Sequence, residues 1–154
     1  MSVLHAVLWT FFVSMVPVIE LRGAIPIGVA AGLPPLAAMV IAIVGNMVPV
    51  PFIILFIRRI FAWMRKIWKP FRVLVEKLET RAEEKMESVR KYAWIGLCIL
   101  VAIPLPGTGA WTGALVAALM DLRLKNSLPA ITLGVLIAGT IVTLVSYGFV
   151  HLLG

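Results

Sequence analysis

The chain has 154 residues, of which 62% are hydrophobic and 14% are charged, and its mean hydropathy is +1.06. Soluble globular domains are roughly half apolar and about a quarter charged, so this composition excludes a water-soluble fold. The net charge of +7 would suit a nucleic-acid-binding protein, but the basic residues are interleaved with acids beside apolar segments. The charge therefore predicts an orientation signal in a membrane protein, with no nucleic-acid partner.

Charge is distributed unevenly along the chain. The first 57 residues contain only two charges, Glu20 and Arg22, and residues 92–120 and 126–154 contain none. Eleven of the 14 basic residues lie in segment 58–91, together with five glutamates. We expect an all-α integral membrane protein whose apolar blocks are separated by this basic segment.

The first apolar run, residues 4–19, is too short to cross a membrane alone. Sixteen helical residues reach about 24 Å, whereas the hydrocarbon core is about 30 Å thick. The break PVIELRGAIPIG, residues 17–28, and the short apolar run 27–33 follow. We expect residues 4–33 to form a re-entrant helical hairpin with its apex in the break, shielded by other segments, because non-helical backbone at membrane depth must be buried or line a wet cavity.

Residues 36–57 are long and apolar enough for a transmembrane helix, despite internal prolines and a glycine. We expect Asn46 in this helix to hydrogen-bond a neighbouring helix. The hairpin and this helix together form a first repeat, residues 1–57.

Segment 58–91 is predicted to be a basic, amphipathic helical linker that Pro70 bends. Basic loops stay in the cytoplasm, so the linker is expected on the cytoplasmic side. Apolar residues recur in its first part at intervals of three or four, the pattern of a helix with one apolar face: Ile60, Met64, Ile67, Phe71, Leu74 and Leu78.

Residues 92–154 are predicted to form a second repeat in the same order. The break PLPGTGAWTG, residues 104–113, lies in a second re-entrant hairpin over residues 93–120. A second transmembrane helix is predicted over residues 128–153.

The two repeats share spaced residues. Pro17 matches Pro104 at an offset of 87, and Gly45 matches Gly139 at an offset of 94. One span between equivalent units makes the repeats inverted, as in many transporters. A cytoplasmic linker then places both termini outside the cell membrane, and two spans enclose so little that we expect a homodimer.

Glu20 and Arg22 are the first candidates for a functional site. An ionisable residue at the bilayer centre is costly, so its presence in an apolar apex points to function. Arg22 can bind a phosphate or carboxylate through its planar fork. Glu20 can exchange protons, because burial favours its neutral form and Arg22 favours its charged form. The alternative is a buried ion pair that only pins the hairpin.

The second apex offers neutral groups for substrate binding: Gly107, Thr108, Gly109, Trp111 and Thr112. Backbone amides near its glycines can form a small anion-binding nest. Glycines four apart, Gly109 with Gly113 and Gly28 with Gly32, also match the spacing of tight helix packing, which we favour for them.

Other chemistry finds little support in the sequence. It contains no nucleotide-binding loop, catalytic triad or metal-ligand spacing, so we expect neither an enzyme nor a cofactor or metal site. Cys98 is the single cysteine, which excludes an intrachain disulfide. His5 and His151 are expected at the membrane interface.

The segments PVIELRGAIPIG and PLPGTGAWTGALVAA, in the order hairpin, helix, basic linker, hairpin, helix, resemble the small multidrug export protein family over nearly the whole chain. That family resembles the DedA (SNARE-associated, VTT) superfamily, whose members share paired re-entrant hairpins and include proteins implicated in polyprenyl-phosphate recycling and lipid scrambling. DedA-type proteins have an acid at the first hairpin, matched by Glu20, and arginines at the second, where this chain has Gly107 and Gly109. Arg22 can substitute from the first hairpin, and the resemblance implies lipid-carrier translocation.

These observations predict a small membrane transporter or flippase that moves an amphiphilic, anionic substrate such as a polyprenyl phosphate or other lipid, with proton coupling through Glu20. Export of hydrophobic cations, with Glu20 as counter-ion, is one alternative. A non-transporting membrane scaffold that docks through the linker is the other.

Overall fold

The computed structural model describes residues 2–153, except that the side chains of residues 71, 74–75, 78–90, 149–150 and 153 lie outside the description. The described residues form helices joined by turns and loops, with no strand among them. The helices are α1 (Val3–Met15), α2 (Glu20–Ala30), α3 (Pro35–Met47), α4 (Pro49–Ile67), α5 (Lys69–Ala102), α6 (Ala110–Leu119) and α7 (Leu124–Leu153).

Two stretches of this fold are long and apolar enough to cross a membrane. They are Pro35–Ile67, with 33 residues, and Leu124–Gly148, with 25. The predicted all-α class is confirmed for the described residues, and the two apolar stretches agree with an integral membrane protein.

Prolines set several helix boundaries, because proline has no N–H to donate to the preceding turn. Pro35 and Pro49 begin α3 and α4. Val48 between them keeps helical torsions, φ −57° and ψ −49°, so α3 and α4 form one apolar stretch. Trp68 is extended, with φ −113° and ψ 99°, and separates α4 from α5. The break therefore precedes Pro70, which lies in the first turn of α5.

The helix ends differ from the predicted linker boundaries. α4 continues past residue 57 to Ile67, and α5 runs from Lys69 into the second hairpin as one helix of 34 residues. Charge changes near residues 58 and 91, but the backbone stays helical because lysine, arginine and glutamate are good helix formers. Ile60 and Met64 of the predicted apolar face are half-buried and Ile67 is exposed, while the side chains of Phe71, Leu74 and Leu78 lie outside the described residues.

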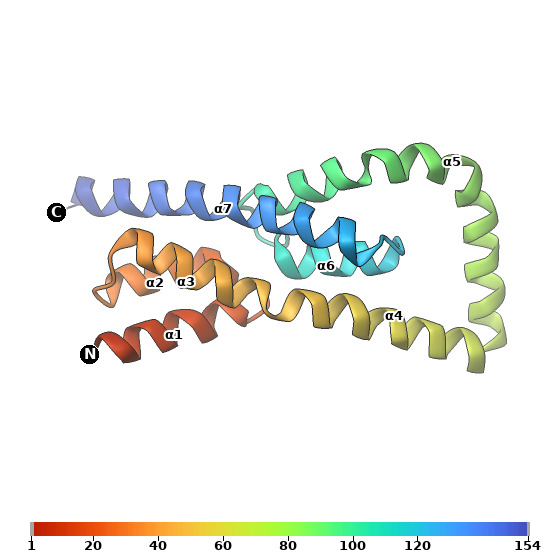
Figure 1. Cartoon of the computed structure of the whole chain (residues 1–154), viewed down its shortest axis with the longest axis horizontal. Coiled ribbons are helices and arrows are strands. Elements are labelled where there is room, and N and C mark those ends of the chain that lie inside the picture. Colours follow the sequence, from red (N-terminus) through yellow and green to blue (C-terminus); the bar gives the residue numbers. More distant parts are fainter. Residues whose placement is uncertain (1, 154) are drawn as a thin grey trace.

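The helices run mainly along the long axis of the molecule (Figure 1). α3 and α4 follow one side, and α7 follows the other. α1 packs against α2 and α3, α5 packs against α7, and α6 packs against α4. Both termini lie at one end, and the connection between α4 and α5 lies at the other. The inversion of the repeats and the re-entrant position of the hairpins stay predictions.

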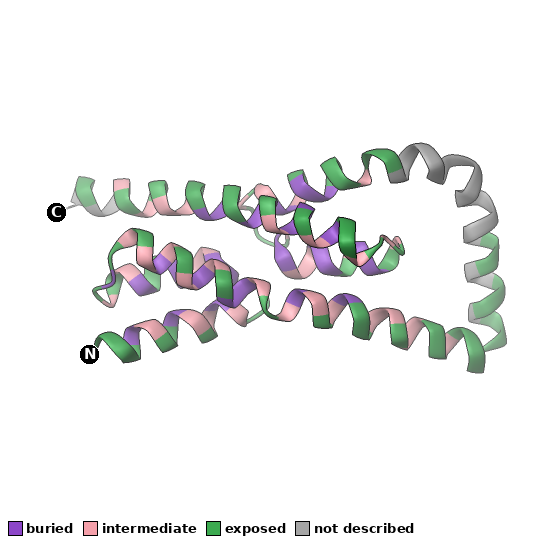
Figure 2. Ribbon diagram, in the orientation of Figure 1, coloured by how far each residue is buried: buried purple, intermediate pink, exposed green. Residues whose placement is uncertain are grey.

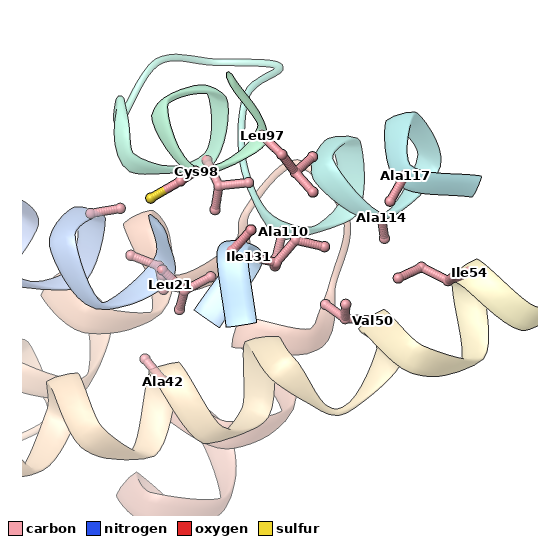
Figure 3. Packing of buried hydrophobic residues seen from close by; sticks show 14 of the residues in the cluster. Leu21, Ala42, Val50, Ile54, Leu97, Cys98, Ala110, Ala114, Ala117 and Ile131 are labelled. Carbon is pink, nitrogen blue, oxygen red and sulfur yellow. The ribbon is translucent and has the colours of Figure 1, made fainter. Parts of the chain in front are cut away.

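Small side chains build the centre of the core (Figure 3). Ala110, Ala114 and Ala117 recur on one face of α6 and are fully buried. They belong to the same cluster as Val50 and Ile54 of α4. Small residues let helix backbones approach closely, which is the usual basis of helix association in membranes.

Exposed residues recur along the helices (Figure 2), and many of them are large and apolar. Phe52 is 69% exposed and Leu144 is 67% exposed. Exposing apolar area to water costs roughly 25 cal/mol per Å², whereas exposing it to lipid tails carries no such free-energy cost. The buried hydroxyls of Thr10 and Ser14 instead donate to carbonyls of their own helix, at 2.7 Å and 2.6 Å. This distribution of polar and apolar groups suits a lipid environment.

Candidate functional site

The first helix break covers residues 16–19 and turns the chain from α1 into α2. It is shorter than the break predicted over residues 17–28, because residues 20–28 are helical and Pro26 lies inside α2. Val18 and Glu20 adopt left-handed backbone, with φ of +79° and +49°. Such torsions are uncommon for residues other than glycine and are outliers for a β-branched valine. The turn directs the Glu20 side chain inward, where the residue is only 4% exposed.

The second break, residues 103–109, separates α5 from α6. Pro104 and Pro106 cannot continue the hydrogen-bond pattern of α5. Gly107 has φ +82° and Gly109 has φ +151°, values that L side chains rarely adopt. A Cβ on Gly109 would lie 2.0 Å from Glu20 Oε2, so the missing side chain is what lets the carboxylate reach the start of α6.

Glu20 caps the N-terminus of α6. Its Oε1 accepts a hydrogen bond from the backbone N–H of Trp111 at 3.1 Å. The N-cap of α6 is Gly109, which has no side chain to accept such a bond. A carboxylate from a distant segment therefore takes the role of an N-cap side chain, and a negative charge at a helix N-terminus also opposes the positive end of the helix dipole.

Arg22 caps the C-terminal end of α5. Its guanidinium donates to the carbonyl oxygens of Leu105 and, at 3.3 Å, Ile103, and to Thr108 Oγ1 at 3.0 Å. Ile103 is the C-cap residue of α5, and Leu105 lies two residues past it. Carbonyls at a helix C-terminus lack intrahelical donors and carry partial negative charge, so the guanidinium stabilises this end. Arg22 Nε is buried and has no hydrogen-bond partner within the part of the chain that the structure describes.

Trp111, in the first turn of α6, caps the C-terminal end of α1. The indole Nε1 of Trp111 donates to the carbonyl oxygen of Met15, at the end of α1, over 3.1 Å. Thr108 Oγ1 donates to Ile103 O at 2.6 Å, and Thr112 Oγ1 donates to Gly107 O at 2.9 Å. We call Glu20, Arg22, Thr108, Gly109 and Trp111 the apical cluster, because they join the two helix breaks.

The structure brings the sequence-predicted site residues together, with contacts that differ from the expected ones. The Glu20 carboxylate, an anion of the chain itself, lies against Gly109 and accepts a bond from one backbone amide, that of Trp111, so the predicted nest of several amides around Gly107 and Gly109 is not seen among the described residues. Among the described residues, no ion pair within 4.0 Å joins Glu20 to Arg22. The two side chains go to opposite ends of broken helices, because each end offers a complementary partial charge.

The paired glycines divide between two roles. A Cβ on Gly28 would lie 2.7 Å from Thr10 Oγ1, and a Cβ on Gly113 would lie 2.5 Å from Val101, so these two serve tight packing as expected. Gly32 has no heavy atom within 4 Å of an added Cβ, and Gly109 faces the Glu20 carboxylate. Packing is therefore the wrong interpretation for Gly32 and Gly109.

Asn46 does not make the interhelical hydrogen bond predicted for it. The residue is fully buried, and its Oδ1 and Nδ2 have no partner among the described residues. It lies one turn from Ala42 and Val50, which are also fully buried and belong to the apolar core cluster. This face of the helix packs against apolar groups, which explains the missing partner.

The sequence analysis does not predict the carbonyl acceptors of Arg22, although the prolines around them are a usable signal. Ile103 and Leu105 alternate with Pro104 and Pro106, and a helix that ends in prolines leaves its carbonyls open to a side-chain donor.

The two histidines are exposed and bond within their own helix ends. His5 contacts the Ser2 hydroxyl, and His151 lies 2.8 Å from Tyr147 Oη.

Of three comparisons with known proteins, one gives a match. Neither the curated proteins nor the solved structures give a match to this chain. The model of a family described as "Putative small multi-drug export protein" matches residues 20–141, a range that contains the whole apical cluster. The resemblance to the DedA superfamily stays a prediction. The chain therefore belongs to the small multi-drug export protein family.

Proposed function

We propose that this protein is a small membrane exporter whose substrate passes between the two helix breaks. The observation that carries the proposal is that charged side chains from the first hairpin cap the helix ends at the second break. Glu20 caps α6 and Arg22 caps α5. Ionisable residues in membrane segments are rare and mark substrate or ion pathways. Transporters with broken helices bind charged groups and ions at the half-helix ends. Here side chains of the chain itself occupy these ends, so a substrate must displace at least one of them.

Backbone strain at the first break supports a movable apex. Val18 and Glu20 hold left-handed torsions that cost about 1–3 kcal/mol each. Strain of this kind concentrates at ligand clamps and switch regions. A rearrangement that releases Glu20 from Trp111 would also release this strain, which lowers the cost of opening the apical cluster.

For the substrate, we infer an amphiphile with an anionic group. Arg22 now donates to backbone carbonyls and a hydroxyl, which are weaker acceptors than a phosphate or carboxylate. An incoming anion can therefore replace them. A polyprenyl phosphate or another lipid would make the protein a flippase, in line with the resemblance to DedA proteins. Glu20, once released from α6, would take up a proton and couple transport to the proton gradient.

Export of hydrophobic cations is the second candidate. The family description favours it, and so does the geometry at Glu20. Arg22 makes its hydrogen bonds to the second break and forms no ion pair within 4.0 Å with Glu20 among the described residues. The buried carboxylate is thus able to act as the counter-ion of a drug cation.

Liposomes that contain the purified protein test both candidates. Transport of labelled polyprenyl phosphate and of a fluorescent drug cation is measured side by side for wild type, Glu20→Gln and Arg22→Ala, with the exposed Arg59→Gln as the control. The anionic candidate expects Arg22→Ala to slow lipid movement about tenfold, because a charged hydrogen bond contributes about 1.5–3 kcal/mol. It also expects Glu20→Gln to remove the pH dependence.

The outcomes separate the candidates. Faster cation export by Arg22→Ala favours the cation exporter. Unchanged transport of both compounds by both variants excludes a role of the apical cluster and leaves the scaffold hypothesis.

We also propose inverted repeats, a cytoplasmic linker and a homodimer. Equivalent packing of α1 on α3 and of α5 on α7 supports the repeats. Both termini lie at the end opposite the α4–α5 connection (Figure 1). This supports the topology, because the connection belongs to segment 58–91, which contains eleven of the basic residues. Cysteine crosslinking in membranes tests the dimer.

A further inference from the structure

A second polar site lies outside the apical cluster. A cavity of about 610 Å³ opens between α4, α5, the loop from α6 to α7 and the start of α7. Three cations, one anion and two neutral polar residues line it: Arg58, Lys91, Arg123, Asp121, Asn126 and Ser127. The lining therefore carries a net positive charge, which favours an anionic ligand.

Arg58 has donors that lack acceptors. Its Nε and Nη2 atoms are buried and make no hydrogen bond to any described residue. These two N–H groups form one edge of the guanidinium, the edge that binds a phosphate or carboxylate through two parallel hydrogen bonds. Buried donors of a charged group are unfavourable without partners, so this edge requires an acceptor.

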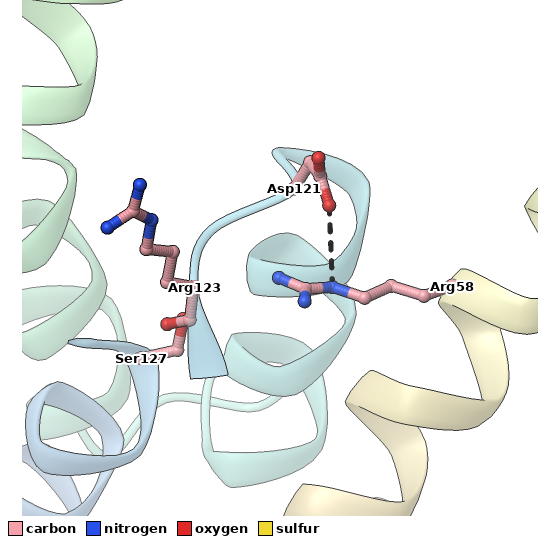
Figure 4. A network of polar contacts seen from close by, with 4 residues as sticks. All are labelled: Arg58, Asp121, Arg123 and Ser127. Atoms are coloured by element: carbon pink, nitrogen blue, oxygen red, sulfur yellow. Dashed lines mark hydrogen bonds and ion pairs between the residues drawn. The ribbon is translucent and has the colours of Figure 1, made fainter. Parts of the chain in front are cut away.

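Asp121 does not supply that acceptor. Its Oδ1 faces Arg58 Nε in Figure 4, but the distance is 3.6 Å, too long for a hydrogen bond. The Asp121 side chain is also 76% exposed, and exposed ion pairs contribute little. Arg123 lies on the other side of the chain segment that follows Asp121 and adds positive charge there (Figure 4).

An apolar cavity adjoins the cationic one. It has a volume of about 430 Å³ and shares Ala93, Leu97 and Leu122 with the first cavity. Leu100 and Val116 extend its wall. A cationic compartment next to an apolar compartment matches the two halves of a lipid, an anionic headgroup and a hydrocarbon tail.

The depth of Arg58 fits a headgroup. It lies 23 residues beyond Pro35, where the first apolar stretch begins. At 1.5 Å per residue this places Arg58 about 35 Å along the helix, beyond a hydrocarbon core of about 30 Å. Arg123 directly precedes Leu124, where the second apolar stretch begins. Both stretches therefore reach the lipid headgroups at this cavity.

We propose that the cationic cavity binds the phosphate of an anionic phospholipid. The Nε and Nη2 edge of Arg58 holds the phosphate, Lys91 and Arg123 add attraction from the rim, and a lipid tail occupies the apolar cavity. This site is separate from the apical cluster, and the proposal does not depend on transport.

Binding is tested on the purified protein in dodecyl maltoside micelles, by thermal unfolding during titration with short-chain phosphatidic acid, phosphatidylcholine or inorganic phosphate. Arg58→Gln should weaken phosphatidic acid binding about tenfold, since it removes a charged bidentate contact. Arg59→Gln is the matched control, because Arg59 is exposed and does not line the cavity, and it should bind as wild type does.

Asp121→Asn gives a prediction of opposite sign. It removes the anion beside Arg58 and should tighten binding, and asparagine tolerates the left-handed backbone at this position (φ +50°). A variant that merely misfolds cannot produce this gain, so the pair of variants tests the site.

The ligands distinguish two sources of phosphate. Binding of phosphatidic acid alone, dependent on Arg58, supports a lipid headgroup. If inorganic phosphate binds as tightly as phosphatidic acid, and its binding depends on Arg58, the site recognises phosphate but its ligand is the free anion and not a lipid. Equal losses with Arg58→Gln and Arg59→Gln, no gain with Asp121→Asn, or equally tight phosphatidylcholine binding would overturn the proposal.

Discussion

The contact between Gly109 and Glu20 gives the sharpest test of the apical cluster. Gly109 adopts φ +151° and ψ −167°, and an added Cβ would lie 2.0 Å from Glu20 Oε2. Gly109→Ala must therefore push the carboxylate away from the Trp111 N–H. Losing a hydrogen bond to a charged group costs about 1.5–3 kcal/mol, and the unfavourable torsions add about 1–3 kcal/mol. We expect the free energy of unfolding to fall by about 2.5–6 kcal/mol.

A double-mutant cycle with Glu20→Ala separates these two contributions. Without the carboxylate, Gly109→Ala retains only the torsional cost, so the cycle should give a coupling energy of about 1.5–3 kcal/mol. Gly107→Ala is the matched control in the same loop, with φ +82° and no heavy atom within 4 Å of the added Cβ. Its cost should be the same with and without Glu20.

The free energies are measured by SDS-induced unfolding in mixed micelles, followed by circular dichroism of the helices. If Gly109→Ala has the same cost with and without Glu20, the carboxylate is not held against this glycine. The capping of α6 by Glu20 would then be wrong.

Two further substitutions test other buried groups. Trp111→Phe removes the indole donor to Met15 and should lower the free energy of unfolding by about 1 kcal/mol, while the control Trp63→Phe, at a residue 64% exposed, should have little effect. Equal losses in thermal unfolding of the two variants would contradict this. Asn46→Leu replaces a buried amide without partners and should raise the free energy of unfolding by about 1–3 kcal/mol; a loss in SDS-induced unfolding would instead show that the amide has a partner.

The candidate site illustrates how far local sequence reaches. Glu20 and Arg22 are recognisable from the sequence because a charge in an apolar block is costly wherever the chain places it. Their partners are not recognisable in the same way. Residues two apart do not face each other on a regular helix. The left-handed torsion of Glu20 sends its carboxylate to Trp111, 91 residues away, and Arg22 bonds Thr108, 86 residues away.

The amino-acid sequence by itself determined the membrane class, the two long apolar stretches and the approximate places of both helix breaks, although both breaks are shorter than predicted because α2 begins at Glu20 and α6 at Ala110. These depend on local properties, namely the hydropathy of some twenty consecutive residues and the prolines that interrupt backbone hydrogen bonds. Tertiary structure alone decided which helix ends Glu20 and Arg22 cap, why Asn46 lacks a partner, and that Arg58 and Asp121 line a cavity beside an apolar one. Those features require segments far apart in the sequence to pack together, and no local pattern encodes their distances.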